Sequence, residues 1–317
     1  MNQDFMPCAS IDTLRARAKM LTKIRHFFDG LGFFEVQTPV LSHDTVVDRH
    51  IEPIALEVNA RGNDQPDVMF LQSSPEFAMK RLLAAGADAI YQMGPAFRAG
   101  EKGTLHNIEF TMLEWYRVGD TYEQGMDLLD QFSQQVLGRP PATRLTYHEA
   151  IALSSGIDLT TKDGIEEFQK LQESLDTVDF SELLDQRIEP TLKKLGTAIL
   201  YDWPADQAAL ARIRRDHIGA YGAFAERFEL YLDGIEIANG YHELTEASEL
   251  ESRNRQVDVH RTNDKKPRLP IQSRLLDAMK HGLPDACGVA LGVDRLMMIA
   301  LDKPRIRDVL TFDIDNA

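Results

Sequence analysis

The chain has 317 residues, of which 43% are hydrophobic and 27% are charged, and this composition is typical of a globular protein. Its 50 acidic and 35 basic residues give a formal net charge of -15, which argues against extended binding to a polyanion such as RNA. No apolar run is long enough to span a membrane, and the N-terminus has no signal pattern, so we expect a cytoplasmic protein.

The first part of the chain is expected to contain a helix, two strands and a second helix. Apolar residues form one stripe along residues 11–29, which predicts a helix. Residues 51–58 and 68–72 are expected to be strands on either side of a turn at 61–64. Ser74 and Pro75 then begin a helix over residues 76–85, in the usual order of a capping residue followed by proline.

The rest of the chain combines hairpin strands with helices. An acidic segment at about 140–197 is interpreted as a helical insertion, and Asp233-Gly234 is a strong signal for a two-residue hairpin turn. The other expected elements are a hairpin at 92–117, a helix at 122–137, strands at 198–203 and 226–239, and helices at 246–261 and 271–281. Strands clustered around hairpins with helices beside them indicate an α+β antiparallel-sheet fold. We expect a single domain over residues 1–317, and two domains are the alternative for a chain of this length.

One strand of the hairpin at 92–117 carries an unusual set of side chains. Alternation places Phe110, Met112, Glu114 and Tyr116 on one face. An aromatic ring, a carboxylate and a phenol on one face could stack a base and bind a cation. The alternative is an ordinary amphipathic strand.

A second signal lies in GVALGVDRLMMIAL, residues 288–301. A short apolar strand passes through Gly292 into a helix with Arg295 in its first turn, where an anion such as phosphate would bind. A glycine turn before a helix also occurs in proteins that bind nothing. The two signals together favour a nucleotide site.

These two segments resemble motifs 2 and 3 of class II aminoacyl-tRNA synthetases, and GFFEVQTPVL, with Pro39, resembles motif 1. The stretches SSPEFAMKRL, HNIEFTMLEWY and IEIANGYHELTEA are similar to the lysyl-tRNA synthetase subgroup, and the similarity covers nearly the whole chain. The resemblance implies a class II antiparallel sheet flanked by helices. The helix at 11–29 leads directly into motif 1, so we expect no anticodon-binding domain.

The resemblance also assigns an ATP site. Arg98 and Arg295 would be the catalytic residues, with Arg98 on the α-phosphate and the incoming carboxylate and Arg295 on the γ-phosphate, since arginine stays charged and binds two oxygens at once. For Arg98 the alternative is a surface salt bridge. The other expected ATP-binding residues are Ala99, Gly100, Glu101, His106, Asn107, Phe110 (stacked on adenine), Glu236, Ile237 and Gly292.

The loop of motif 2 departs from the synthetase pattern at two positions. Gly100 stands where an acidic residue is common, with Glu101 one step later, and Leu105 replaces an arginine just before His106. How these departures change the ATP contacts is left open.

Two glutamates in the hairpin at 226–239 are candidate Mg²⁺ ligands. A two-residue turn at Asp233-Gly234 pairs Tyr231 with Glu236, which puts Glu229 on the same face as Glu236. Two uncompensated carboxylates on one face suggest a cation between them, and the family uses matching glutamates for Mg²⁺. The alternative is two solvated acids.

The substrate would be a small molecule with two ammonium groups, because the candidate residues are three carboxylates and a phenol. By resemblance, Glu114, Tyr116 and Glu243 surround the side-chain ammonium and Glu76 meets the backbone amine. Glu243 alone also fits a residue at the start of a helix. Ser74, Pro75, Asn239 and Ala290 complete the expected substrate-binding residues; Ala290 stands where lysyl-tRNA synthetases have glycine.

A lysyl-synthetase-like core without an anticodon domain resembles the elongation factor P lysine ligase family. The resemblance implies that ATP activates (R)-β-lysine as an adenylate, that the product is attached to a lysine of elongation factor P, and that the protein is a homodimer without stable tRNA binding. Two alternatives stay open: activation of α-lysine or another diamino acid for a different acceptor, and a non-catalytic lysine-sensing paralogue. The presence of Arg98 and Arg295 favours catalysis.

Overall fold

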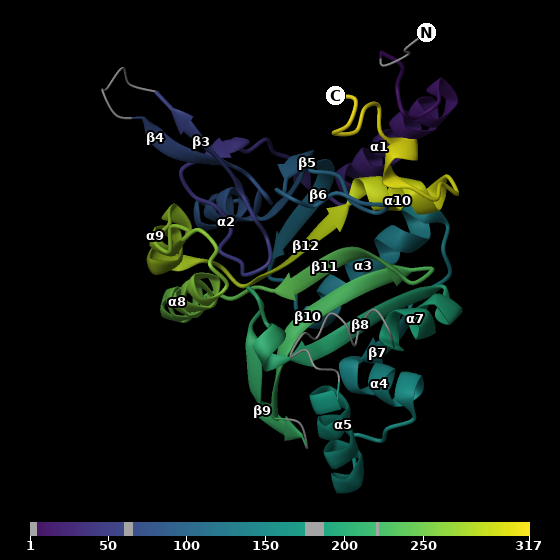
Figure 1. Ribbon diagram of the computed structural model, residues 1–317, viewed down its shortest axis with the longest axis vertical. Coiled ribbons are helices and arrows are strands. Elements are labelled where there is room, and N and C mark those ends of the chain that lie inside the picture. The colour runs from purple at the N-terminus through teal and green to yellow at the C-terminus, as the bar shows by residue number, and fades with distance from the viewer. Residues whose placement is uncertain (1–4, 60–65, 175–186, 220–221) are drawn as a thin grey trace. The chain divides into compact units, whose positions relative to one another are not determined.

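The computed structural model describes residues 5–59, 66–174, 187–219 and 222–317 and divides into two compact units (Figure 1). The first unit combines Met1–Asp120 with Leu244–Ala317, and the second is Thr121–Glu243. Each unit contains strands and helices, which confirms the α+β class. A single domain over residues 1–317 stays a prediction. None of the described helices is long and apolar enough to cross a membrane.

The first unit begins with helix α1 (Ile11–Gly30), close to its predicted bounds. The side chain of Ser10 caps the helix by accepting a hydrogen bond from the backbone N–H of Thr13 at 3.2 Å. Phe28 is fully buried and packs its ring 5.2 Å from that of Trp115. The helix also buries Ile24 and Phe27, whereas Ile11 at its start is exposed, so only the second half of the predicted apolar stripe faces the core.

The main sheet of the first unit is built around the predicted hairpin at 92–117. Its strands pair in the order β1 (Phe34–Glu35), β5 (Ala89–Phe97), β6 (Glu109–Val118) and β12 (Ala286–Gly292). The pairs β5–β6 and β6–β12 are antiparallel, and only the two-residue pair β1–β5 is parallel. Since β6 is paired on both sides, it is a rigid support for the side chains it carries.

A small antiparallel sheet and several helices complete the first unit. The sheet joins β2 (Leu41–Ser42), β3 (Ile54–Val58) and β4 (Asp67–Leu71), and the predicted turn at 61–64 lies outside the described residues. The helices are α2 (Glu76–Ala84), α8 (Ala247–Asn263), α9 (Arg274–Gly282), α10 (Val293–Ala300) and the short η3 (Ile306–Val309). Pro75 occupies the cap position of α2, and Ser74 Oγ accepts from Glu76 N–H at 3.0 Å.

The second unit contains a sheet with strand order β11-β10-β8-β7, and β9 pairs with β10. The strands are β7 (Thr143–Thr146), β8 (Thr197–Pro204), β9 (Ile213–Gly219), β10 (Gly222–Leu232) and β11 (Ile235–His242). The helices are α3 (Tyr122–Leu137), α4 (Tyr147–Ser155), α5 (Lys162–Ser174), α7 (Glu189–Leu195) and the short η2 (Ala205–Gln207). The pair β7–β8 is parallel, so this sheet is mixed rather than purely antiparallel as expected.

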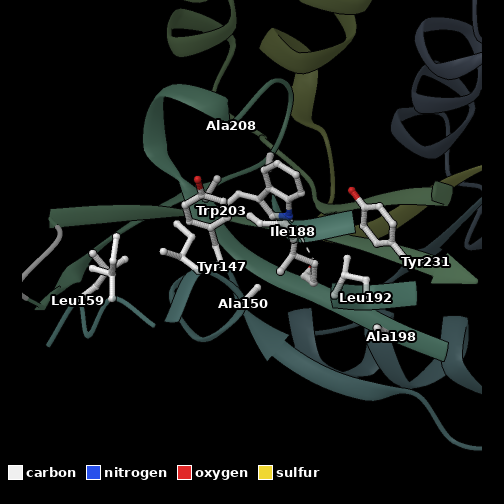
Figure 2. Packing of buried hydrophobic residues seen from close by; sticks show 14 residues of the cluster. Tyr147, Ala150, Leu159, Ile188, Leu192, Ala198, Trp203, Ala208 and Tyr231 are labelled. Carbon is white, nitrogen blue, oxygen red and sulfur yellow. Dashed lines mark hydrogen bonds between the residues drawn. The ribbon is translucent and has the colours of Figure 1, made fainter. Parts of the chain in front are cut away.

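The core of the second unit lies between the helices of the acidic segment and β8 (Figure 2). The rings of Tyr147 and Trp203 stack with 5.9 Å between their centres, and Leu192 of α7 is buried in the same cluster. Burial of such side chains stabilises by about 1.5 to 3 kcal/mol each. The predicted helical insertion at about 140–197 therefore shares a core with the strand that follows it; its residues 175–186 lie outside the described residues.

Candidate active site

Arg98 lies directly after β5, where the hairpin loop begins. Its backbone N–H donates to Ile108 O at 3.0 Å, and its Nε lies 3.5 Å from Ser73 O. The guanidinium carbon is 5.2 Å from the centre of the Phe110 ring. The side chain is 25% exposed, and its contact with Glu101 is long, at 3.7 Å. Arg98 is therefore held in place without being committed to a close salt bridge, the alternative considered for it above.

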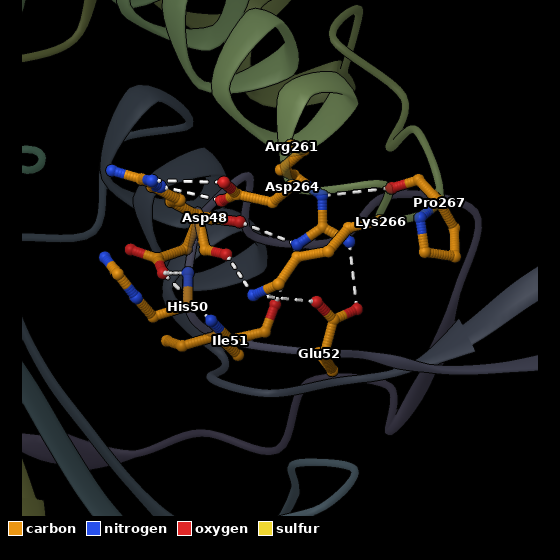
Figure 3. Close-up of polar contacts among 9 residues, drawn as sticks. Asp48, His50, Ile51, Glu52, Arg261, Asp264, Lys266 and Pro267 are labelled. Carbon is orange, nitrogen blue, oxygen red and sulfur yellow. Dashed lines mark hydrogen bonds and ion pairs between the residues drawn. The ribbon is translucent and has the colours of Figure 1, made fainter.

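A buried cation that the sequence did not reveal supports the start of this loop. The guanidinium of Arg261 in α8 is fully buried and donates to the carbonyl oxygens of Pro267 and Asp48 and to Glu52 Oε2 (Figure 3). Glu52 O in turn accepts from Ala99 N–H at 2.8 Å. A chain of hydrogen bonds thus runs from α8 to the residue beside Arg98.

The departure at Gly100 has a structural explanation. Gly100 has φ of +79°, a conformation that favours glycine, so an acidic side chain at this position would be strained. Glu101, the residue after Gly100, forms the contact with Arg98 instead. The loop therefore places its carboxylate one residue later than the synthetase pattern.

Arg295 of α10 contacts the same loop. Its Nε donates to Leu105 O at 3.3 Å, and its Nη2 contacts Nε2 of His106. Two of the predicted phosphate ligands, one from each motif, are thereby brought together. Asn107 is buried and hydrogen-bonded internally, since its amide donates to Glu109 O at 2.7 Å and accepts from Ile314 N–H at 3.1 Å.

The residue before Arg295, Asp294, is buried and belongs to a polar triad that sequence reasoning missed. Asp294 Oδ1 lies 2.6 Å from Arg17 Nη1 of α1, and its Oδ2 accepts from Thr111 N–H of β6 at 2.7 Å. Arg17 Nη2 also donates to Thr111 Oγ1 at 2.9 Å. Burial raises the pKa of Asp294, and Arg17 opposes this effect. The triad fixes the start of α10 against β6.

Glu114 of β6 is the centre of the predicted substrate cluster in the first unit. It is 1% exposed, and it accepts hydrogen bonds from Ser74 Oγ at 2.8 Å and from Tyr116 OH at 2.6 Å. Burial and the neighbouring Glu76 raise its pKa to about 7. The structure thus brings together four of the predicted substrate-binding residues, Ser74, Glu76, Glu114 and Tyr116.

Ser73 and Ser74 connect this cluster to Arg98, which is expected to be catalytic. Ser73 O faces Arg98 Nε, while the next side chain, Ser74, donates to Glu114. Glu76 follows and forms a buried ion pair with Lys80, with 2.6 Å between Oε1 and Nζ. This short segment therefore connects Arg98, a cation suited to binding phosphate, to Glu76 and Glu114, whose carboxylates are suited to binding ammonium groups.

Ala290 lies directly opposite Glu114 in the antiparallel register of β12 and β6, and Gly292 lies opposite Met112. Residues paired across strands share a face of the sheet. Ala290, one of the expected substrate-binding residues, therefore lies beside Glu114, the expected ligand of the side-chain ammonium.

In the second unit, the hairpin places Glu229 and Glu236 as expected near the turn. Leu232 pairs with Ile235 and Tyr231 with Glu236. Glu229 is not uncompensated, however: its Oε1 receives Arg227 Nε at 3.1 Å and its Oε2 receives Tyr231 OH at 2.6 Å. The premise of an unbalanced carboxylate was therefore wrong for Glu229, because alternation puts Arg227 on the same face.

Glu229 and Glu236 still form a chemically suitable pair for Mg²⁺. Burial raises the pKa of Glu229 to about 6, opposed by Arg227 and reinforced by the negative charge of Glu236. A cation near both would relieve that repulsion. The described residues hold no group of three or more potential protein ligands, and Mg²⁺ at phosphate sites commonly uses only one or two carboxylates.

A β-bulge shapes the rest of the hairpin. The register passes from Tyr231 opposite Glu236 to Leu230 opposite Ala238, so Ile237 between them takes no partner of its own on β10. Bulges of this kind free backbone groups and are frequent next to active sites. The bulge leaves backbone groups of Ile237, one of the expected ATP-binding residues, without a partner on β10, and no pattern in the sequence predicted this bulge.

Asn239 and Glu243 are the remaining predicted substrate residues of the second unit. The Asn239 amide donates to Tyr241 OH at 3.1 Å, while its buried Oδ1 has no hydrogen-bond partner among the described residues. Glu243 is 1% exposed, and its backbone forms an isolated bridge with Ala211. Glu243 is thus a buried acid rather than a solvated residue at the start of a helix.

Comparison with known proteins gives consistent matches. The family model described as tRNA synthetases class II (D, K and N) matches residues 5–316. A Salmonella arizonae protein named elongation factor P–(R)-β-lysine ligase is 41% identical over 328 aligned residues, covering 99% of this chain and 98% of that protein. A Vibrio cholerae protein with the same name is also 41% identical, covering 100% of this chain and 99% of that protein.

Proposed function

The chain belongs to the class II tRNA synthetase (D, K and N) family, and we propose that it is an ATP-dependent ligase that attaches (R)-β-lysine to a lysine side chain of elongation factor P. The names of these relatives suggest the substrate and the acceptor. The observation that carries the proposal is the segment Ser73–Glu76, which connects Arg98 to the buried carboxylates. A molecule with a carboxylate at one end and ammonium groups at the other matches this order of charges.

In the first step, a carboxylate oxygen of β-lysine attacks the α-phosphorus of ATP. A new P–O bond forms, the bond to the β-phosphate bridging oxygen breaks, and pyrophosphate leaves. Arg98 would hold the α-phosphate and the carboxylate together, and Arg295 with His106 would hold the γ-phosphate. Permanent, preorganised positive charge is the principal means by which proteins stabilise such a transition state. Gly292 and the loop residues Ala99, Gly100, Glu101 and Asn107 would seat the nucleotide beside Phe110.

In the second step, the neutral ε-amine of the acceptor lysine attacks the acyl carbon of the adenylate. An amide bond forms, the bond between the acyl carbon and the phosphate oxygen breaks, AMP leaves with the bonding electron pair, and the amine nitrogen releases one proton to solvent. No tRNA is needed for this transfer. A net charge of -15 is compatible with a protein acceptor and unfavourable for a polyanion.

Mg²⁺ would be held by Glu229 and Glu236 of the second unit, with Ile237 contributing its backbone to ATP binding. The ion, when bound, neutralises phosphate charge. Arg227 and Tyr231 keep the Glu229 carboxylate in a fixed orientation. The Glu229 carboxylate is therefore expected to be ordered before ATP arrives.

Discrimination of the amino acid would depend on Ser74, Pro75, Glu76, Glu114, Tyr116, Asn239, Glu243 and Ala290. A neutral or acidic amino acid would leave buried carboxylates without a cation, which is costly.

We further propose a cytoplasmic homodimer through the motif 1 region and no stable binding of tRNA. Activation of α-lysine for another acceptor is the second candidate; a silent paralogue is disfavoured because Arg98 and Arg295 are both in place.

The test is ATP–pyrophosphate exchange with a panel that contains (R)-β-lysine, α-lysine, ornithine and leucine. We expect exchange with the diamino acids, highest for (R)-β-lysine, and none above background with leucine. Exchange with none of the four would reject the catalytic proposal. Exchange with α-lysine alone would favour the second candidate.

A further inference from the structure

An internal ammonium group lies inside the cluster that should receive the ammonium groups of the substrate. The Lys80 side chain is 2% exposed, and its Nζ lies 2.6 Å from Glu76 Oε1, one turn earlier on α2. The same Nζ is 6.0 Å from the centre of the Tyr116 ring. Lys80 is therefore in the middle of the predicted substrate residues, although it is not among them.

A buried lysine is expensive to maintain for packing alone. Apolar residues of similar volume often replace a buried ion pair with no loss of stability, so such a pair is weak evidence for a purely structural role. Here the pair involves Glu76, and it lies beside a second buried carboxylate, Glu114. The position of Lys80 points to a role in the charge balance of the site.

We propose that Lys80 is a positioning residue for amino acid recognition: its ammonium holds Oε1 of Glu76, turns Oε2 toward the backbone amine of the substrate, and balances the charge of Glu76 beside Glu114. The proposal rests on the proposed function, since it assigns the substrate amine to Glu76. It explains how two carboxylates can share a buried cluster before substrate binds. Each is then available to one ammonium group of a diamino acid.

The charged groups around Glu114 lead to a specific consequence. Glu76 raises the pKa of Glu114, and Lys80 lowers it; Ser74 and Tyr116 also lower it through hydrogen bonds. Helix α9, which packs on α2, carries Arg274, Asp277, Lys280 and His281, and Arg274 is directed to Asp44 at 3.4 Å. Loss of the Lys80 charge should therefore increase protonation of the cluster at neutral pH.

The experiment uses Lys80→Met, Lys80→Arg and a control, Lys280→Met, on the exposed side of α9. Pyrophosphate exchange is measured from pH 6.0 to 8.5 with (R)-β-lysine, and KM is determined separately for the amino acid and for ATP. For Lys80→Met, we expect the acidic limb of kcat/KM to move up by about one pH unit, because a nearby opposite charge shifts a carboxylate by about 1 to 3 units. The KM for (R)-β-lysine should rise roughly tenfold at pH 7 and recover at pH 8.5, with KM for ATP unchanged.

Lys80→Arg tests positioning even if Lys80→Met fails to fold. The guanidinium keeps the positive charge, so the acidic limb of kcat/KM should stay at its native pH. Because a guanidinium binds both oxygens of a carboxylate, KM for (R)-β-lysine should rise. Lys280→Met should match the native protein in every respect. If a folded Lys80→Met or Lys80→Arg protein has both the native acidic limb of kcat/KM and the native KM for (R)-β-lysine, the proposal for Lys80 is overturned. The proposed function would not be affected by that result. Absence of exchange in the native protein at every pH would overturn it together with the proposed function.

Discussion

Arg17 of α1 forms an ion pair with the buried Asp294 of α10, with 2.6 Å between Nη1 and Oδ1. The pair couples the helix that precedes motif 1 to the residue beside Arg295. Because Asp294 also accepts from Thr111 N–H of β6, three elements from distant parts of the sequence meet at one carboxylate. The position of the predicted γ-phosphate ligand therefore depends on α1.

Replacement of Arg17 by methionine should destabilise the protein by about 3 to 5 kcal/mol, because it leaves the buried Asp294 without its counter-ion. Urea unfolding monitored by tryptophan fluorescence measures this change. Arg15→Met is the matched control on the same helix, since Arg15 forms an exposed pair with Asp12 and should have no measurable effect. Equal stability of the two variants would show that the Arg17 pair contributes nothing beyond a surface contact.

Arg98→Ala should lower the rate of pyrophosphate exchange by a factor of about 10² to 10³, corresponding to roughly 3 to 4 kcal/mol of transition-state stabilisation. The fold should persist, because the side chain is partly exposed and has no close ion pair. Circular dichroism and the melting temperature check this. Arg255→Ala, at an exposed pair on α8, is the control. Near-native exchange by Arg98→Ala would remove Arg98 from the catalytic site.

The pH dependence of the native enzyme should report Glu114. Its pKa is raised to about 7, so a proton neutralises it as pH falls below that value and the cation-binding carboxylate is lost. We expect kcat/KM for a diamino acid to decrease below about pH 7 and to level off above it. Glu114→Gln should remove this decrease at low pH and lower kcat/KM at every pH measured. An unchanged limb in that variant would assign the titration to another group.

Ala290→Gly should change the choice of amino acid. Ala290 lies opposite Glu114, and cross-strand neighbours have Cβ atoms about 4.5 to 5.5 Å apart, so its methyl group narrows the cluster. With α-lysine the amine and carboxylate share one carbon and crowd this position, whereas β-lysine moves the amine one carbon along. A difference of this size is worth about 1 to 3 kcal/mol.

The measured quantity is the ratio of kcat/KM for the two lysines. We expect Ala290→Gly to raise the value for α-lysine more than that for (R)-β-lysine, with KM for ATP nearly unchanged. If both values change by the same factor, the methyl group serves packing only.

Much of the fold could be predicted because periodicity and turn signals were strong. The bounds of α3 and the pairing of Tyr231 with Glu236 agree with the sequence interpretation. The bulge at Ile237 and the parallel pair β7–β8 could not be predicted. Both depend on contacts between strands that no local pattern encodes.

The sequence analysis named the acidic residues of the candidate site. It did not name the cations that support them. Arg17 and Arg261 each occur on a helix beside other polar residues, so they have the pattern of solvated side chains. Arg17 is buried by a partner more than two hundred positions away, which the sequence cannot show. Lys80 gave a usable signal, since it lies four positions after Glu76 and such pairs meet on one helix face.

The most direct test of the central claim is the intact mass of elongation factor P after incubation with the native protein, ATP, Mg²⁺ and (R)-β-lysine. The account predicts a mass increase of one β-lysyl group, its location on a lysine side chain by peptide mapping, and loss of the increase with Arg98→Ala. A parallel reaction with tRNA in place of elongation factor P should yield no aminoacylated product. An unmodified acceptor despite active pyrophosphate exchange, or efficient charging of tRNA, would contradict the account.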